Sequence, residues 1–181
     1  MGRACWTLWS SVASGAVLVL LAMLIGGCAS KPEPAATPYV DRVLVKKAER
    51  RLELHKDGDV VRAYPISLGD RPRGHKIQEG DERTPEGNYV LDWRNPQSAY
   101  HKSIHVSYPN ELDRNVARAL GVSPGGMIMI HGLPNWLSSP RLAEEYRNRD
   151  WTDGCIALGS DEEMDEVWRL VRDGTPITIL P

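Results

Sequence analysis

The 181-residue sequence contains no phenylalanine, so its aromatic packing must come from six tryptophans and six tyrosines. It also has no excess of one charge, because 22 Lys and Arg against 24 Asp and Glu give a formal net charge of −2. The absence of a basic stripe or patch argues against a nucleic-acid-binding protein. With 41% hydrophobic and 25% charged residues, the composition is that of one ordinary globular domain.

Spacings typical of zinc sites are missing as well, since there is no HExxH motif and no pair of closely spaced cysteines. His101 and His105 would share one face of an expected strand, but no third ligand stands at a recognised spacing. We therefore expect neither a metal nor another cofactor.

Long apolar runs are absent except near the N-terminus, where Arg3 precedes SVASGAVLVLLAMLIGG and Cys28. This run is too short and too rich in small residues for a comfortable membrane-spanning helix, and the pattern is typical of a secretory signal. Its end, LIGGC, resembles a bacterial lipoprotein processing box, in which cleavage before the cysteine is followed by lipidation of that cysteine. A plain secretory signal and an uncleaved anchor helix are the alternatives.

The expected organisation is a signal peptide over 1–27, a Pro- and Ala-rich tether over 28–38 and a folded domain over 39–181. Ala29 follows the cysteine, and by the same resemblance this favours the outer membrane. We expect a periplasmic protein that is anchored to a bacterial membrane through a lipid on Cys28.

Alternating apolar and polar residues predict strands over most of the domain, and Asp57-Gly58 predicts a tight hairpin. The fold class that follows is mainly β with inserted helices (α+β), as a β-sandwich or barrel. The expected strands cover 41–47, 51–69, 88–93, 102–108, 127–132 and 176–180; the expected helices cover 111–120, 141–149 and a segment from the Ser160 and Glu163 capping box to a stop at Gly174.

One cysteine is left over by this organisation. We expect Cys5 to leave with the leader, and Cys28, if acylated on sulfur, cannot pair, so Cys155 then has no disulfide partner. Such a thiol is intermolecular, buried and inert, or reactive. A reactive thiol needs a nearby base or positive charge to ionise. His131, at the end of the buried strand before Gly132, is the best candidate for the base, and we expect it to hold the sulfur ionised.

Two further features surround this pair. The segment 133–150, between the histidine and the cysteine, contains prolines and a tryptophan and is expected to form a lid. Gly154 can leave backbone N–H groups pointing at a reacting carbonyl, which would make an oxyanion hole.

These residues carry a family resemblance. The stretch IHG at 130–132, followed by TDGCIAL at 152–158, resembles the signature of the L,D-transpeptidase (YkuD-type) catalytic domain family. GDERTPEGNY at 80–89 is similar to another stretch of that family. HKSIHVSYPN at 101–110 and DEEMDEVWRLVRDGTPITI at 161–179 narrow the resemblance to the YafK-like branch.

The resemblance implies a catalytic domain that acts on peptidoglycan stem peptides. Cys155 would be the nucleophile that forms a thioester, His131 the general acid and base, and Gly154 part of the oxyanion hole. Arg83 and Trp151 are candidate substrate contacts, although a turn-flanking arginine and a core tryptophan are the ordinary readings of these residues.

Asp153 departs from the family pattern, because most members have a second histidine there. A carboxylate beside the thiol disfavours the thiolate, unless it orients a histidine or a substrate amine. The expected function is a periplasmic cysteine acyltransferase of cell-wall synthesis or remodelling, an L,D-transpeptidase. One alternative is an L,D-amidase or hydrolase with the same Cys-His site, which releases peptide or a wall-linked lipoprotein. Another is a non-catalytic wall-binding lipoprotein.

Overall fold

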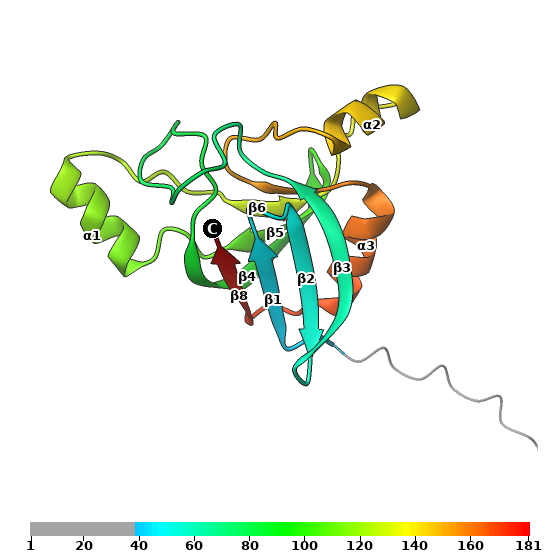
Figure 1. Ribbon diagram of the computed structural model, residues 1–181, viewed down its shortest axis with the longest axis horizontal. Helices are drawn as coiled ribbons and strands as arrows, with labels where there is room; N and C mark the ends of the chain where they lie inside the picture. The colour runs from blue at the N-terminus through cyan, green and yellow to red at the C-terminus, as the bar shows by residue number, and fades with distance from the viewer. Residues whose placement is uncertain (1–38) are drawn as a thin grey trace, which may run out of the picture. The chain divides into compact units, whose positions relative to one another are not determined.

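The computed structural model describes residues 39–181, so the expected signal peptide (1–27) and tether (28–38) lie outside the described residues. The described part forms eight strands and three helices (Figure 1). The strands close into a barrel in the order β1-β2-β3-β7-β6-β5-β4-β8. The predicted mainly β fold with inserted helices is therefore confirmed.

The strand boundaries follow the alternation in the sequence. The hairpin at Asp57-Gly58 forms as predicted, with φ values of 52° and 93° that match a two-residue turn requiring positive φ at both positions. The strands are β1 (Arg42–Lys46), β2 (Arg51–Lys56), β3 (Asp59–Ser67), β4 (Gly87–Ser98), β5 (His101–Val106), β6 (Met129–His131), β7 (Ile156–Leu158) and β8 (Thr175–Leu180).

The helices are α1 (Glu111–Leu120), α2 (Pro140–Arg147) and α3 (Asp161–Leu170). Among residues 39–181, no helix is long and apolar enough to cross a membrane. The helix predicted to run on towards Gly174 ends at Leu170, because Val171 is extended and fully buried in the core. The predicted capping box is half formed: Ser160 accepts from the Glu163 N–H, but the Glu163 carboxylate accepts from the Gly159 N–H at 2.9 Å.

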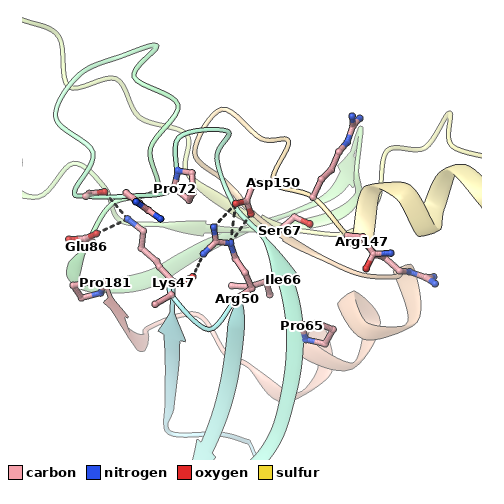
Figure 2. A pocket seen from close by; sticks show the side chains of 15 residues that line it. Lys47, Arg50, Pro65, Ile66, Ser67, Pro72, Glu86, Arg147, Asp150 and Pro181 are labelled. Atoms are coloured by element: carbon pink, nitrogen blue, oxygen red, sulfur yellow. Dashed lines mark hydrogen bonds and ion pairs between the residues drawn. The ribbon is translucent and has the colours of Figure 1, made fainter.

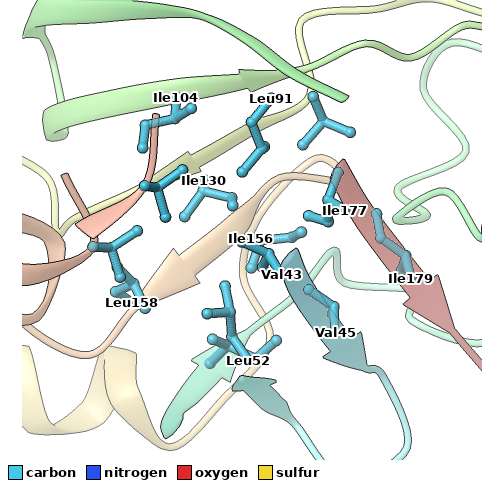
Figure 3. Packing of buried hydrophobic residues seen from close by; sticks show 14 of the residues in the cluster. Val43, Val45, Leu52, Leu91, Ile104, Ile130, Ile156, Leu158, Ile177 and Ile179 are labelled. Carbon is cyan, nitrogen blue, oxygen red and sulfur yellow. The ribbon is translucent and has the colours of Figure 1, made fainter. Parts of the chain in front are cut away.

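Apolar side chains from opposite sides of the barrel fill its interior (Figure 3). Ile130 of β6 and Ile156 of β7 are both fully buried there. Because side chains alternate along a strand, the residues that flank these two isoleucines face the other side of the sheet. That outer side of β6 and β7 is where the candidate catalytic residues lie.

Helix α1 shows an unexpected orientation. Its apolar stripe would ordinarily pack on the core, but Leu112 and Leu120 are 70% and 59% exposed, while Asp113 is buried. The Asp113 carboxylate accepts a hydrogen bond from the Tyr89 hydroxyl at 3.1 Å and lies 3.1 Å from His75 Nε2. The helix is therefore held to the domain through the face that carries Asp113 and the fully buried Ala117.

Candidate active site

Cys155 and His131 are brought together by two neighbouring parallel strands. The β6–β7 register pairs Ile130 with Ile156 and His131 with Ala157. Cys155 stands two residues before Ala157, so its side chain and that of His131 lie on the same side of the sheet. Both line one cavity of about 330 Å³.

His131 is 3% exposed, and its ring lies within a group of aromatic side chains. The ring centroids of Tyr100 and Trp151 are 4.6 Å and 5.6 Å from that of His131. Its Nδ1 is 2.7 Å from the Gly132 carbonyl oxygen. A carbonyl can only accept, so Nδ1 carries the proton and Nε2 has a free lone pair. The residue that orients His131 is thus Gly132, through its backbone, and not Asp153.

Burial lowers the pKa of His131 to about 4, an effect that the hydrogen bond to Gly132 opposes. The imidazole is therefore neutral at pH 7. In this form it can accept a proton through Nε2 but cannot stabilise a thiolate by its charge.

The Cys155 residue is half-buried, and its thiol contacts the backbone of one neighbouring segment. The Met129 N–H donates to Sγ at 3.4 Å, and Sγ is 3.6 Å from the Met127 carbonyl oxygen. Burial raises the pKa of the Cys155 thiol; the Met129 N–H opposes this rise, and the Asp153 carboxylate adds to it. The expectation of an ionised resting thiol is therefore wrong, because the sulfur is desolvated and the histidine beside it is neutral.

Gly154 is required by a close approach of two chain segments. It has φ of +127°, and a Cβ there would lie 2.5 Å from the Arg83 carbonyl oxygen. A Cβ on Gly69 would lie 2.1 Å from the Glu82 carbonyl oxygen and 3.1 Å from Gly154 Cα. The loop between β3 and β4 therefore passes directly against the backbone of the cysteine turn.

One of the backbone N–H groups expected to form the oxyanion hole already donates a hydrogen bond within this turn. The Gly154 N–H donates to Thr152 Oγ1 at 3.2 Å, and that hydroxyl donates to the Cys155 carbonyl oxygen at 2.8 Å. Thr152 thereby ties both ends of the turn together. The Gly154 N–H is therefore already used within the turn, whereas the Met129 N–H points at the sulfur itself.

A buried lysine holds the β3–β4 loop in place (Figure 2). Lys47 is 2% exposed and its Nζ donates to the Gly74 carbonyl at 2.7 Å, the Thr84 carbonyl at 2.8 Å and the Glu86 carboxylate at 2.7 Å. These three bonds anchor both arms of the loop. The hollow of about 920 Å³ drawn in Figure 2 is lined by Lys47 and also by Arg50, which pairs with Asp150 at 2.6 Å. It contains no nucleophilic thiol, so the smaller cavity is the candidate site.

The other predicted site residues separate into two groups. Asp153 and Trp151 line the cavity with Cys155. The segment expected to form a lid, 133–150, adds Trp136 and Tyr146 to its wall and includes α2. Arg83 does not line this cavity: its side chain lines a separate hollow of about 270 Å³, and only its backbone carbonyl approaches Gly154.

Residues 40–179 match the family model described as YkuD, the L,D-transpeptidase catalytic domain. The chain belongs to this family. The YafK protein of Escherichia coli (strain K12) is 31% identical over 139 residues, which cover 64% of this chain and 54% of that protein.

Two solved structures are similar to this L,D-transpeptidase domain. One is Pgp2 of Campylobacter jejuni, described as a helical cell shape determining protein, with 29% identity and a TM-score of 0.58 over 78% of this chain and 48% of that one. The other is Bd1075 of Bdellovibrio bacteriovorus, with 26% identity and a TM-score of 0.54 over 82% of this chain and 50% of that one. The chain thus spans about half the length of each of these relatives.

Sequence reasoning missed several residues of this candidate site. Tyr100 reaches it from the turn between β4 and β5, and Tyr146 from α2. Neither stands in a motif, so no local signal marks them. Thr152 lies within the TDGC stretch, and its role could have been inferred because threonine hydroxyls often bond the backbone two residues on. In the part of the chain that the structure describes, no three His, Cys, Asp or Glu side chains converge to hold a metal ion.

Proposed function

We propose that this domain is a cysteine acyltransferase that acts on peptidoglycan stem peptides, as an L,D-transpeptidase. The observation that supports this most directly is the placement of Cys155 and a neutral His131 on adjacent strands, facing one cavity, in a domain of the L,D-transpeptidase family. A base with a free Nε2 beside a protonated thiol is the arrangement that general-base activation of a nucleophile needs.

The reaction begins with proton transfer from Sγ of Cys155 to Nε2 of His131 as the sulfur attacks the carbonyl carbon of an L,D-peptide bond. A C–S bond forms, and the Cys155 N–H stabilises the oxyanion. The C–N bond then breaks, and the leaving amine takes the proton from His131. A thioester remains on Cys155. When a second amine attacks this thioester, it gives a proton to His131 and forms a new amide, and the sulfur regains its proton.

Hydrolysis by the same site is the second candidate, and Asp153 favours it. This exposed carboxylate lines the cavity beside the thiol. A nearby negative charge stabilises the protonated form of an incoming amine, and a protonated amine has no lone pair with which to attack. Water carries no such penalty. In this case the thioester is hydrolysed, and peptide or a wall-linked lipoprotein is released.

We also propose that the domain works in the periplasm, held to the outer membrane by a lipid on Cys28. The support is the signal pattern and the processing-box resemblance in the sequence. The similarity to Pgp2, a cell shape determining protein, supports a role in wall remodelling that affects cell shape.

The test is incubation of the purified protein with muropeptides, followed by mass analysis of the products and of the intact protein. We expect an acyl adduct on Cys155, and Cys155→Ala should lower turnover by at least about 10³-fold. New crosslinked dimers would support transpeptidation, whereas shortened peptides without dimers would support hydrolysis. A folded wild-type protein that binds wall material but forms neither product nor adduct would overturn the enzymatic proposal in favour of wall binding. A thermal melt of Cys155→Ala that matches the wild type is the folding control.

A further inference from the structure

The cavity around Cys155 combines an aromatic wall with a single formal charge. Besides His131, four of its lining residues are aromatic: Tyr100, Trp136, Tyr146 and Trp151. Asp153 is the one lining residue that is charged at neutral pH, since His131 is buried and neutral. Asp153 therefore gives the cavity a negative charge, and the other lining residues are neutral.

The aromatic rings form one continuous wall. From Trp136 to Tyr146, Trp151 and Tyr100, consecutive ring centroids are 5.9, 5.0 and 5.9 Å apart. The face of an aromatic ring carries partial negative charge and attracts cations. One cation already uses this property, because the Arg149 guanidinium lies 4.7 Å from the Tyr146 ring centroid.

Two cations of the surrounding residues pair with carboxylates other than Asp153, so the Asp153 carboxylate can pair with a ligand. The charge of Lys76 reaches the thiol, but this side chain is 3% exposed and pairs with Asp81 at 2.8 Å. Arg149 has Glu145 at 3.6 Å. An exposed carboxylate that lines a cavity attracts cationic ligands and repels anionic ones.

We propose that this cavity recognises a primary ammonium group of the substrate, and that Asp153 is the residue that determines this specificity. The aromatic wall flanks the ammonium while the carboxylate pairs with it. This inference rests on the proposed function in one respect, namely that the ammonium belongs to a stem peptide with a free amino group. The bound ammonium keeps its proton, so it serves recognition and does not attack the thioester.

The charge preference can be measured without any wall substrate. Two methanethiosulfonate reagents of similar size, one carrying a trimethylammonium and the other a sulfonate, are allowed to modify the full-length protein at low salt. Modification is followed in the peptide that contains Cys155, which separates it from Cys5 and Cys28. Because the same thiolate attacks both reagents and displaces the same sulfinate, a change in thiol pKa cancels in the ratio of their rates.

We expect the cationic reagent to react about tenfold faster than the anionic one, relative to the same ratio for a free thiol. Asp153→Asn should remove most of this preference. Asp59→Asn, at the exposed start of β3, is the matched control and should retain it. An equal ratio in the wild type and Asp153→Asn overturns the inference, even if wall activity is present.

A second measurement tests whether the ammonium group that the cavity prefers is the free amino group of a stem peptide. With a stem peptide and its N-acetylated form, the wild type should show a KM about tenfold lower for the free amine, with little change in kcat. This difference should disappear in Asp153→Asn. Equal KM values for both forms in the wild type would overturn the assignment. If no wall substrate reacts but the reagent ratio still depends on Asp153, the proposed function fails while the ammonium preference stands.

Discussion

At the scale of single residues, the site depends on a histidine that is deprived of water. The His131 ring is enclosed by Tyr100 and Trp151, and its Nδ1–H is bonded to Gly132. Desolvation disfavours the charged imidazolium, and one carbonyl acceptor does not compensate for it. The result is a rigid neutral base rather than half of an ion pair.

This burial predicts a pH dependence of stability. The folded pKa of His131 is about 4, below the ordinary value of 6.5. The unfolded state therefore binds a proton between these values when the folded state does not, and the free energy of unfolding falls as pH falls from about 6.5 towards 4. The loss amounts to about 3 kcal/mol from this residue. Above pH 6.5 both states are neutral and the effect is absent.

Urea unfolding at pH 7 and pH 4.5, for the wild type and His131→Asn, measures this contribution. We expect the stability difference between the two proteins to shrink at the lower pH, because the variant has no imidazole to protonate. A difference that stays constant between the two pH values would show that His131 is not desolvated in the folded state.

At the scale of elements, the β3–β4 loop supports the nucleophile turn from behind. Its carbonyls at Glu82 and Arg83 lie where side chains on Gly69 and Gly154 would have to be. Lys47, directly after β1, holds the loop through three hydrogen bonds. A buried ammonium is costly to desolvate, so its presence is explained by the carbonyls and the carboxylate that surround it.

Lys47→Met keeps the apolar stem but leaves the Glu86 carboxylate and two carbonyls without their donor. We expect a loss of about 3 kcal/mol in the free energy of unfolding, measured with urea, and slower alkylation of Cys155 because the turn loses its support. Lys56→Met is the control. The single ion pair of Lys56, at 3.7 Å from the exposed Asp57, is weak, so this substitution should change the free energy of unfolding by less than about 0.5 kcal/mol. Equal losses in the two variants would contradict the anchoring role.

At the scale of the whole molecule, the last strand closes the barrel. β8 pairs in parallel with β1 and antiparallel with β4, and Ile177 and Ile179 are buried in the core between them. Without β8, two strands would each gain an open edge and the core would lose two large side chains.

Deletion of residues 175–181 is therefore expected to abolish cooperative unfolding, as followed by circular dichroism during heating. Deletion of Pro181 alone removes one exposed residue and should leave the transition within a few degrees of the wild type. A cooperative melt in the longer deletion would mean that the barrel does not need its closing strand.

Much of this arrangement could be predicted from local patterns. The Asp57-Gly58 hairpin and the 111–120 helix appear as expected, because each depends on the φ preferences and hydrogen bonds of a few consecutive residues, such as the Asn110 and Gly121 caps of α1. The predicted end of α3 at Gly174 was wrong. The helix ends earlier, at Leu170, because Val171 is extended and buried in the core. The pairing of His131 with Cys155 was predicted from the place of His131 at the end of a buried strand and then from the family resemblance, and the strand register places them on the same side of one sheet.

The sequence by itself determined the strand-rich class of the domain and the identity of the leftover thiol, because alternation and cysteine count need no knowledge of distant contacts. Only the tertiary structure decided that this thiol and its base are both neutral. It also decided that Asp153 is the one charged residue lining a cavity with an aromatic wall. The reason is that desolvation and local charge depend on which remote segments pack around a side chain. Tyr100 and Tyr146 line the site from two different parts of the chain, and the charge of the buried Lys76 acts on the thiol from a third.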